Sequence, residues 1–169
     1  MFEKLLNKEK LNVKNKLILA IYVIFSFFLY VYFGVTKKPD IYILMSYTFL
    51  THFWLIGFDY RALRKLNYFF FWLLIGMIHF VIYINIKDNS AYAFVKGHAA
   101  NGFRTTLILL LIFQCIRFLS FEVQGMDYVS PPKSGKMDMF NEREYTNWDI
   151  LFTFVLLGVI LLSNIFFLI

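Results

Sequence analysis

The sequence predicts an all-α, polytopic integral membrane protein: a small bundle of five transmembrane helices. Hydrophobic residues make up 60% of the 169 residues and charged residues only 17%, a balance typical of membrane proteins. The apolar residues gather in five long runs, at residues 17–35, 41–58, 68–86, 105–121 and 150–169. Each run has close to the ~20 residues that an α-helix needs to cross a ~30 Å hydrocarbon layer.

The segments between the runs are too short to fold as a second domain. The longest one, residues 122–149, has 28 residues, below the ~50 residues at which independent domains normally begin. We therefore expect a single membrane domain, residues 17–169, that carries one sizeable loop at 122–149.

The first run follows a basic segment, residues 1–16, in which Phe2, Leu5 and Leu6 share one helical face. Such a segment fits a helix that lies on an anionic lipid surface. It also fits a frayed lead whose lysines only set the topology. The run is not expected to be a cleaved signal peptide, because Thr-Lys-Lys-Pro follows it in place of a small-residue cleavage site.

Helix-start signals mark the second and fifth runs. Pro39 and Asp40 precede the second run, and both a proline at the first helical position and an acid near a helix N-terminus are favourable. Thr146 or Asn147 can cap the fifth run, which has Asp149 in its first turn.

The third and fourth runs are joined by residues 87–104, where Gly97 and Gly102 predict breaks in regular structure. The fourth run is the shortest and the most polar of the five. The loop that follows it contains Pro131-Pro132 and Gly135, which disfavour helix and strand there.

Lysine and arginine residues predict the orientation in the bilayer. When the loops are assigned alternately to two sides, the side with the N-terminus and the 122–149 loop carries twelve basic residues, counting Arg117 at the end of the fourth run, and the other side five. The positive-inside rule therefore places the N-terminus in the cytoplasm and the C-terminus outside. A bias toward Lys, Asn, Ile and Phe favours a bacterial inner (plasma) membrane, with an organellar inner membrane as the alternative.

Ionisable residues inside membrane spans are the default candidates for function, and His52 and His79 are the first of these. They lie on consecutive antiparallel runs, ~10 Å and ~16 Å from the cytoplasmic ends at 1.5 Å per residue. Neutral histidines can form hydrogen bonds between helices, ligate a haem b iron, or relay protons and contact a quinone. The difference in depth favours hydrogen bonding over haem ligation.

Arg117 is the third ionisable residue within a span. It lies about one turn from the cytoplasmic end of the fourth run and shares a helical face with Gln114. We expect its side chain to reach the membrane interface, or to pair with Asp59 or Asp149 at neighbouring helix ends.

The 122–149 loop is the largest polar surface outside the spans and is predicted to dock partners. Its candidate docking residues are Pro131, Pro132, Lys133, Lys136 and Arg143. Cys115, the only cysteine, lies in the fourth run, so it cannot form an intrachain disulfide or a thiolate metal cluster. The serine, glutamate and lysine residues form no catalytic, nucleotide-binding or metal-binding motif, and nothing indicates nucleic-acid binding.

Three functions remain open from the sequence. We expect first a non-catalytic accessory or scaffold subunit of a larger inner-membrane complex, which contacts other membrane subunits through aromatic helix faces and the 122–149 loop. The second is a membrane anchor that binds haem b or a quinone between the second and third spans. The third is an enzyme or carrier that acts on lipid-linked substrates and holds an anionic headgroup with Arg117 and the 122–149 loop.

Overall fold

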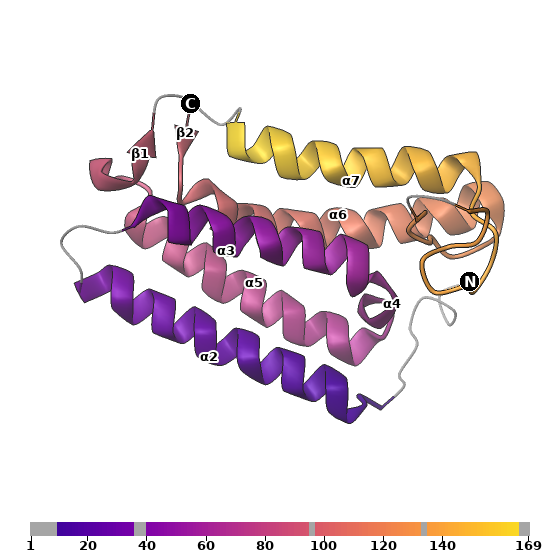
Figure 1. Ribbon diagram of the computed structural model, residues 1–169, viewed down its shortest axis with the longest axis horizontal. Coiled ribbons are helices and arrows are strands. Elements are labelled where there is room, and N and C mark those ends of the chain that lie inside the picture. Colours follow the sequence, from indigo (N-terminus) through magenta and orange to yellow (C-terminus); the bar gives the residue numbers. More distant parts are fainter. Residues whose placement is uncertain (1–9, 36–39, 95–96, 133–134, 166–169) are drawn as a thin grey trace.

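The computed structural model describes residues 10–35, 40–94, 97–132 and 135–165, and these residues are mostly helical. Figure 1 shows the long helices side by side. Their bounds are α2 (Val13–Val35), α3 (Ile41–Phe53), α5 (Leu66–Ile86), α6 (Asn101–Gln124) and α7 (Asn147–Ile165).

Shorter elements lie between the long helices. A π-helix, η1 (Trp54–Phe58), extends α3 and is followed by α4 (Tyr60–Leu63). A 3-10 turn, η2 (Ser90–Tyr92), leads into a small antiparallel hairpin of β1 (Ala93–Phe94) and β2 (Gly97–His98).

The long helices alternate in direction (Figure 1). Helix α5 packs against α2 and α6, while α6 also contacts α3 and α7. Helix α4 and the 125–146 loop lie at one end of the bundle, which we call the loop end, and the β1–β2 hairpin lies at the other end (Figure 1). This alternation places the predicted cytoplasmic segments on one side.

Four helices are long and apolar enough to cross a membrane: α2, the combined α3 and η1, α5 and α6. Helix α7 contributes a shorter apolar segment within the described residues. Many large apolar side chains on these helices are exposed, among them Phe27 (67%), Leu50 (65%) and Phe154 (66%). A helical membrane protein accounts for this surface, because hydrocarbon and not water then surrounds it.

The helix bounds extend several predicted runs. Helix α6 begins at Asn101 and ends at Gln124, so Gly102 does not break it as predicted. Gly125 ends α6 with a φ of 69°, the left-handed conformation that commonly closes a helix. Of the predicted basic segment, residues 1–9 lie outside the described residues, and residues 13–16 form the first turn of α2.

The predicted helix caps are present where the structure describes them. The Asp40 side chain accepts a hydrogen bond from the Tyr42 backbone N–H at 2.9 Å. At the start of α7, the Thr146 N–H donates to the Asp149 carboxylate (2.8 Å), and the Asp149 N–H donates to the Thr146 hydroxyl (3.3 Å). This reciprocal pair is a capping box, which satisfies two backbone donors that the helix itself leaves open.

Candidate functional site

A polar network lies in the middle of the bundle and joins four helices. Ser26 of α2, Tyr47 of α3 and His79 of α5 form a triangle, with the serine and tyrosine oxygens 2.8 Å apart and each 3.0 Å from His79 Nε2. The other ring nitrogen of His79 lies 3.1 Å from the hydroxyl of Thr106 on α6. That hydroxyl also lies 3.1 Å from His52 Nε2. We call these five residues the histidine network.

The network suits a hydrocarbon environment because its hydroxyl and imidazole groups can form hydrogen bonds with one another while they stay uncharged. In neutral His79 one ring nitrogen donates and the other accepts, and each has a hydroxyl partner: Ser26 and Tyr47 at Nε2, and Thr106 at Nδ1. His52 and His79 are both fully buried, and polar groups in lipid are stabilised by partners on neighbouring helices. The sequence prediction of hydrogen bonds between helices therefore matches the geometry of these two histidines.

The space beside His79 is filled. The rings of Tyr47 and Phe103 lie 5.6 Å and 5.2 Å from its imidazole, both in edge-on packing, and the Thr106 hydroxyl lies between the two histidines. These residues do not fit a haem iron ligated by both histidines, because the porphyrin would need the volume that the rings and the hydroxyl occupy. His52 Nδ1 alone among these ring nitrogens lacks a hydrogen-bond partner.

Arg117 is buried near the loop end of α6, but its partner is neither Asp59 nor Asp149. Its guanidinium forms an ion pair with Asp127 (2.7 Å) and a hydrogen bond with Gln114 (3.1 Å). The predicted proximity to Gln114 is thus present, while the predicted acidic partners are wrong. Asp127 reaches Arg117 because the left-handed turn at Gly125 directs the chain back over the helix end.

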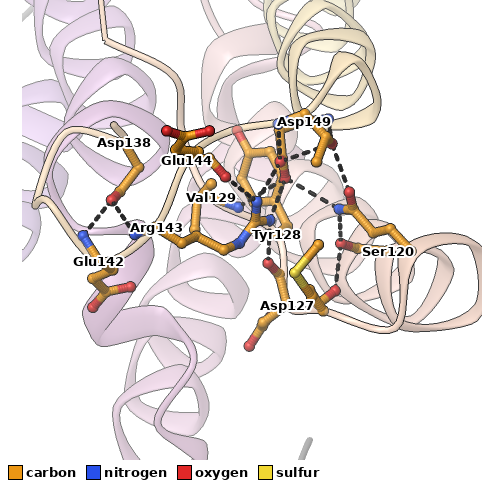
Figure 2. Close-up of polar contacts among 12 residues, drawn as sticks. Ser120, Asp127, Tyr128, Val129, Asp138, Glu142, Arg143, Glu144 and Asp149 are labelled. Atoms are coloured by element: carbon orange, nitrogen blue, oxygen red, sulfur yellow. Dashed lines mark hydrogen bonds and ion pairs between the residues drawn. The ribbon is translucent and has the colours of Figure 1, made fainter. Parts of the chain in front are cut away.

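The 125–146 loop is fastened to the helix ends by a second arginine (Figure 2). Arg143 binds Asp149 through both guanidinium nitrogens at 2.9 Å, and it also donates to the backbone oxygens of Asp127 (2.7 Å) and Glu144 (2.8 Å). Asp149 has no exposed surface. We call Arg117, Asp127, Arg143 and Asp149 the arginine lock.

A turn around Asp138 shapes the outer part of this loop. Its carboxylate accepts hydrogen bonds from the Tyr60 hydroxyl (2.5 Å) and from the backbone N–H groups of Phe140 (3.1 Å), Glu142 (2.5 Å) and Arg143 (3.1 Å). Burial acts to raise the pKa of Asp138, but these hydrogen bonds to the anion outweigh it and hold the pKa below its ordinary 3.8.

The predicted docking residues have different surroundings in this folded loop. Arg143 is committed to the arginine lock, whereas Lys136 is exposed and Pro131 and Pro132 are half-buried. Lys133 lies outside the described residues. The loop is therefore a folded cover over the helix ends.

A polar pocket of about 480 Å³ opens at the loop end of the bundle. Its lining includes four basic residues, one acid on the loop and one buried acid, namely Lys14, Arg61, Arg64, Lys65, Glu142 and Asp59. Glu142 pairs with Arg61 at 2.5 Å and with Arg64 at 2.7 Å. The pocket carries an excess of positive charge and has the size of a lipid headgroup or another small anion.

Asp59 follows the π-helix η1 and is only 6% exposed. It accepts a hydrogen bond from the Tyr68 hydroxyl. Burial raises the pKa of Asp59 above its ordinary 3.8; Tyr68, the indoles of Trp54 and Trp72 and the charge of Lys14 lower it only in part. The indoles act through longer contacts, since neither indole N–H has a partner at hydrogen-bonding geometry.

An apolar groove of about 580 Å³ lies between α2 and α3. Its lining combines four apolar residues (Ile21, Phe25, Ile43 and Leu50) with five that carry a hydroxyl (Tyr22, Tyr42, Ser46, Tyr47 and Thr51). A groove with this mostly apolar lining could take an extended apolar chain.

A row of side-chain contacts connects the groove to the polar pocket. Tyr22, which lines the groove, packs edge-on against Trp72 with ring centres 4.7 Å apart. Trp72 packs in turn against Tyr68 at 6.5 Å, and Tyr68 donates to Asp59 in the pocket. We call the groove, this row and the pocket together the α2–α3 seam.

The sequence analysis did not find the seam. Its residues lie on separate helices, and each of them alone is of a type that is common in membrane helices or at their ends. Asp59, Arg61, Arg64 and Lys65 are close in sequence, and this charged cluster beside a span end was the available signal. No group of three or more His, Cys, Asp or Glu side chains within the described residues is arranged to hold a metal ion. Comparisons with family models, curated proteins and solved structures find no match to this chain.

Proposed function

We propose that this protein binds an anionic amphiphile, such as a phospholipid or a lipid-linked phosphate, along the α2–α3 seam. The ligand class is that of the lipid-linked alternative from the sequence, but the proposed site is the seam and no longer Arg117 with the 122–149 loop. The observation that carries the proposal is the position of a basic polar pocket and an apolar groove along the same two spans, α2 and the combined α3 and η1. An anionic amphiphile needs a basic polar site for its headgroup and, next to it, an apolar site for its chain.

The spacing along the helices supports a single ligand. On α2, Asn15 lines the pocket and Tyr22 lines the groove, seven residues later. On the opposite side, Phe58 lines the pocket and Thr51 lines the groove, seven residues earlier. Both separations correspond to ~10 Å at the helical rise of ~1.5 Å per residue, which is the depth from a headgroup to the upper part of its acyl chain.

The proposed topology places the pocket in the cytoplasmic leaflet. We take α7 as a fifth span, because it lies antiparallel to α6 in Figure 1. The N-terminus and the 125–146 loop then face the cytoplasm of a bacterial inner membrane or the corresponding side of an organellar one. Basic residues near a membrane surface attract anionic lipids by ~1 kcal/mol each, which favours a headgroup at this position.

Native mass spectrometry of the detergent-purified protein tests the proposal. We expect phosphatidylglycerol to bind more tightly than phosphatidylcholine with the same acyl chains. The double variant Lys14→Gln/Arg61→Gln should weaken phosphatidylglycerol binding about tenfold or more, given ~1 kcal/mol per charge. The matched control Lys87→Gln/Lys136→Gln removes the same charge outside the pocket and should keep the wild-type affinity.

A second pair of variants tests the groove. Ser46→Trp fills the groove and should weaken both lipids, whereas Leu74→Trp, on an exposed part of α5, should weaken neither. Equal binding of the two lipids by the wild type, together with no effect of either pocket or groove variants, would contradict the proposal.

A second candidate function is the accessory or scaffold subunit. It is favoured by four large apolar side chains of the loop that stay partly exposed at the loop end: Met126 (40%), Met137 (37%), Met139 (38%) and Phe140 (38%). Methionine and phenylalanine are frequent at protein interfaces. We propose that a membrane or peripheral partner would dock there.

Blue-native electrophoresis after mild detergent extraction tests this second function. A complex larger than the monomer should be seen for the wild type and should dissociate in the variant Met137→Ser/Met139→Ser. Migration as a bare monomer in both cases would argue against a scaffold role.

A further inference from the structure

The polar pocket contains one feature that does not suit a simple anion site. Asp59 lies within it, buried, beside the four basic residues. As an anion, Asp59 repels a bound phosphate and competes for the same cations. As a neutral acid, it can donate a hydrogen bond to a phosphate oxygen.

Charged and hydrogen-bonding side chains surround Asp59 from several elements. Lys14 approaches from α2, Trp54 from η1, and Tyr68 and Trp72 from α5. Arg61 and Arg64 of α4, Lys65 at the start of α5 and Glu142 of the loop line the same pocket. Glu142 already bridges the two arginines, so Asp59 is the acid that is left to respond to a ligand.

Resting on the proposed lipid-binding function, we infer that the anionic headgroup binds the seam together with a proton, which is taken up from solution by the Asp59 carboxylate. The bound state then has a neutral Asp59 that faces the phosphate and keeps its contact with Tyr68. The direction of the pKa shift agrees, since burial already favours the neutral acid.

The coupling predicts a pH dependence with a definite sign. Above the pKa of Asp59, the free protein must gain a proton to bind, so affinity falls as pH rises, by up to about tenfold per pH unit for one proton. Below that pKa the carboxyl is already neutral, and affinity becomes constant.

The experiment measures phosphatidylglycerol binding to the full-length protein in detergent between pH 5 and 8. The phosphodiester of this lipid stays charged throughout this range, so the ligand itself contributes no titration. We compare the wild type with Asp59→Asn, which keeps an acceptor for Tyr68 and cannot ionise, and with Glu142→Gln. We expect a fall in affinity with pH for the wild type and Glu142→Gln, and a constant, high affinity for Asp59→Asn.

Direct measurement of proton uptake makes the test independent of how well the variants fold. In weakly buffered solution, at a pH where wild-type affinity is falling, phosphatidylglycerol binding to the wild type should remove about one proton from solution per bound lipid. Wild-type binding that is tight but independent of pH, without proton uptake, overturns the inference and leaves the proposed function standing. Absence of phosphatidylglycerol binding at every pH overturns both.

Discussion

The histidine network and the arginine lock are both polar, but the network is buried whereas Asp127 and Arg143 of the lock stay partly exposed. The histidine network joins helices with hydroxyl and imidazole groups that form hydrogen bonds without a charge. The arginine lock fastens a loop with ion pairs at a helix end. A charge in the centre of a bilayer is expensive, whereas the interface allows charged groups to stay partly hydrated. Depth in the membrane thus selects which kind of polar contact each region uses.

The difference also separates two tasks. The histidine network links α2, α3, α5 and α6, and its member Tyr47 also lines the apolar groove. The arginine lock holds the loop over the helix ends, and Glu142 on that loop lines the polar pocket. Each half of the proposed seam is therefore shaped by one of the two regions.

The largest effect is expected from breaking the arginine lock. Arg117→Met leaves Asp127 with only its longer contact to Arg64 (3.7 Å). It should lower the free energy of unfolding by about 3 kcal/mol, the lower end for buried pairs that lose one member, because Asp127 is partly exposed. Unfolding by SDS in mixed micelles measures it. Arg61→Met removes an exposed arginine from an ion pair and should change stability by at most about 1 kcal/mol. Equal losses in the two variants would show that burial does not matter here.

Crowding the helix contact beside the histidine network should give the next effect. A methyl group on Gly102 would lie 2.3 Å from the Thr48 hydroxyl oxygen, so Gly102→Ala should cost about 1–3 kcal/mol of unfolding free energy. Gly158 has open space at the same position. The control Gly158→Ala should be neutral or stabilising by up to about 1 kcal/mol. The close α3–α6 approach is contradicted if both alanines are tolerated alike.

Removing an imidazole tests the network itself. His79→Phe loses contacts with Ser26, Tyr47 and Thr106 and should lower the free energy of unfolding by about 1–2 kcal/mol, since hydrogen bonds between membrane helices average ~0.6 kcal/mol. Ser26→Ala leaves the Tyr47 contact in place and should cost less. A larger loss for Ser26→Ala than for His79→Phe would place the serine, and not the histidine, at the centre of the network.

The smallest effect is expected for the contribution of Asp138 to stability at low pH. The pKa of Asp138 is lowered in the folded protein, so its contribution to stability is complete above the unfolded value of 3.8 and is lost as pH falls through the lower folded value. The wild type should exceed Asp138→Asn in unfolding free energy by about 1 kcal/mol at pH 7. The difference should shrink below pH ~3.8. A difference that grows on acidification would reverse the assigned sign.

Features that depend on neighbouring residues in the sequence could be predicted from it. Run length and hydropathy located the helices, and Asp40 and Thr146 marked two of their starts. Contacts made through space were harder to predict. Gly102 suggested a break because glycine disfavours helices, but its missing side chain is what admits Thr48. Asp127 escaped notice as the partner of Arg117, because only the turn at Gly125 brings it back.

The polar residues show the same limit. His52 and His79 were visible as intramembrane histidines, whereas Ser26 and Thr106 gave no signal, since single hydroxyls are common in membrane helices. Their depth difference of ~6 Å, counted at ~1.5 Å per residue, overstated their separation, because a single Thr106 hydroxyl contacts both rings.

The central claim is that the α2–α3 seam holds an anionic amphiphile, and photo-crosslinking tests it most directly. A phosphatidylglycerol analogue with a diazirine in its acyl chain is added to vesicles that contain the protein, irradiated, and the labelled residues are mapped by mass spectrometry. The account predicts labels concentrated on groove residues such as Tyr22, Ser46 and Leu50, reduced by excess unlabelled phosphatidylglycerol. Labels spread evenly over the exposed faces of α5, α6 and α7, and unaffected by competitor, would contradict it.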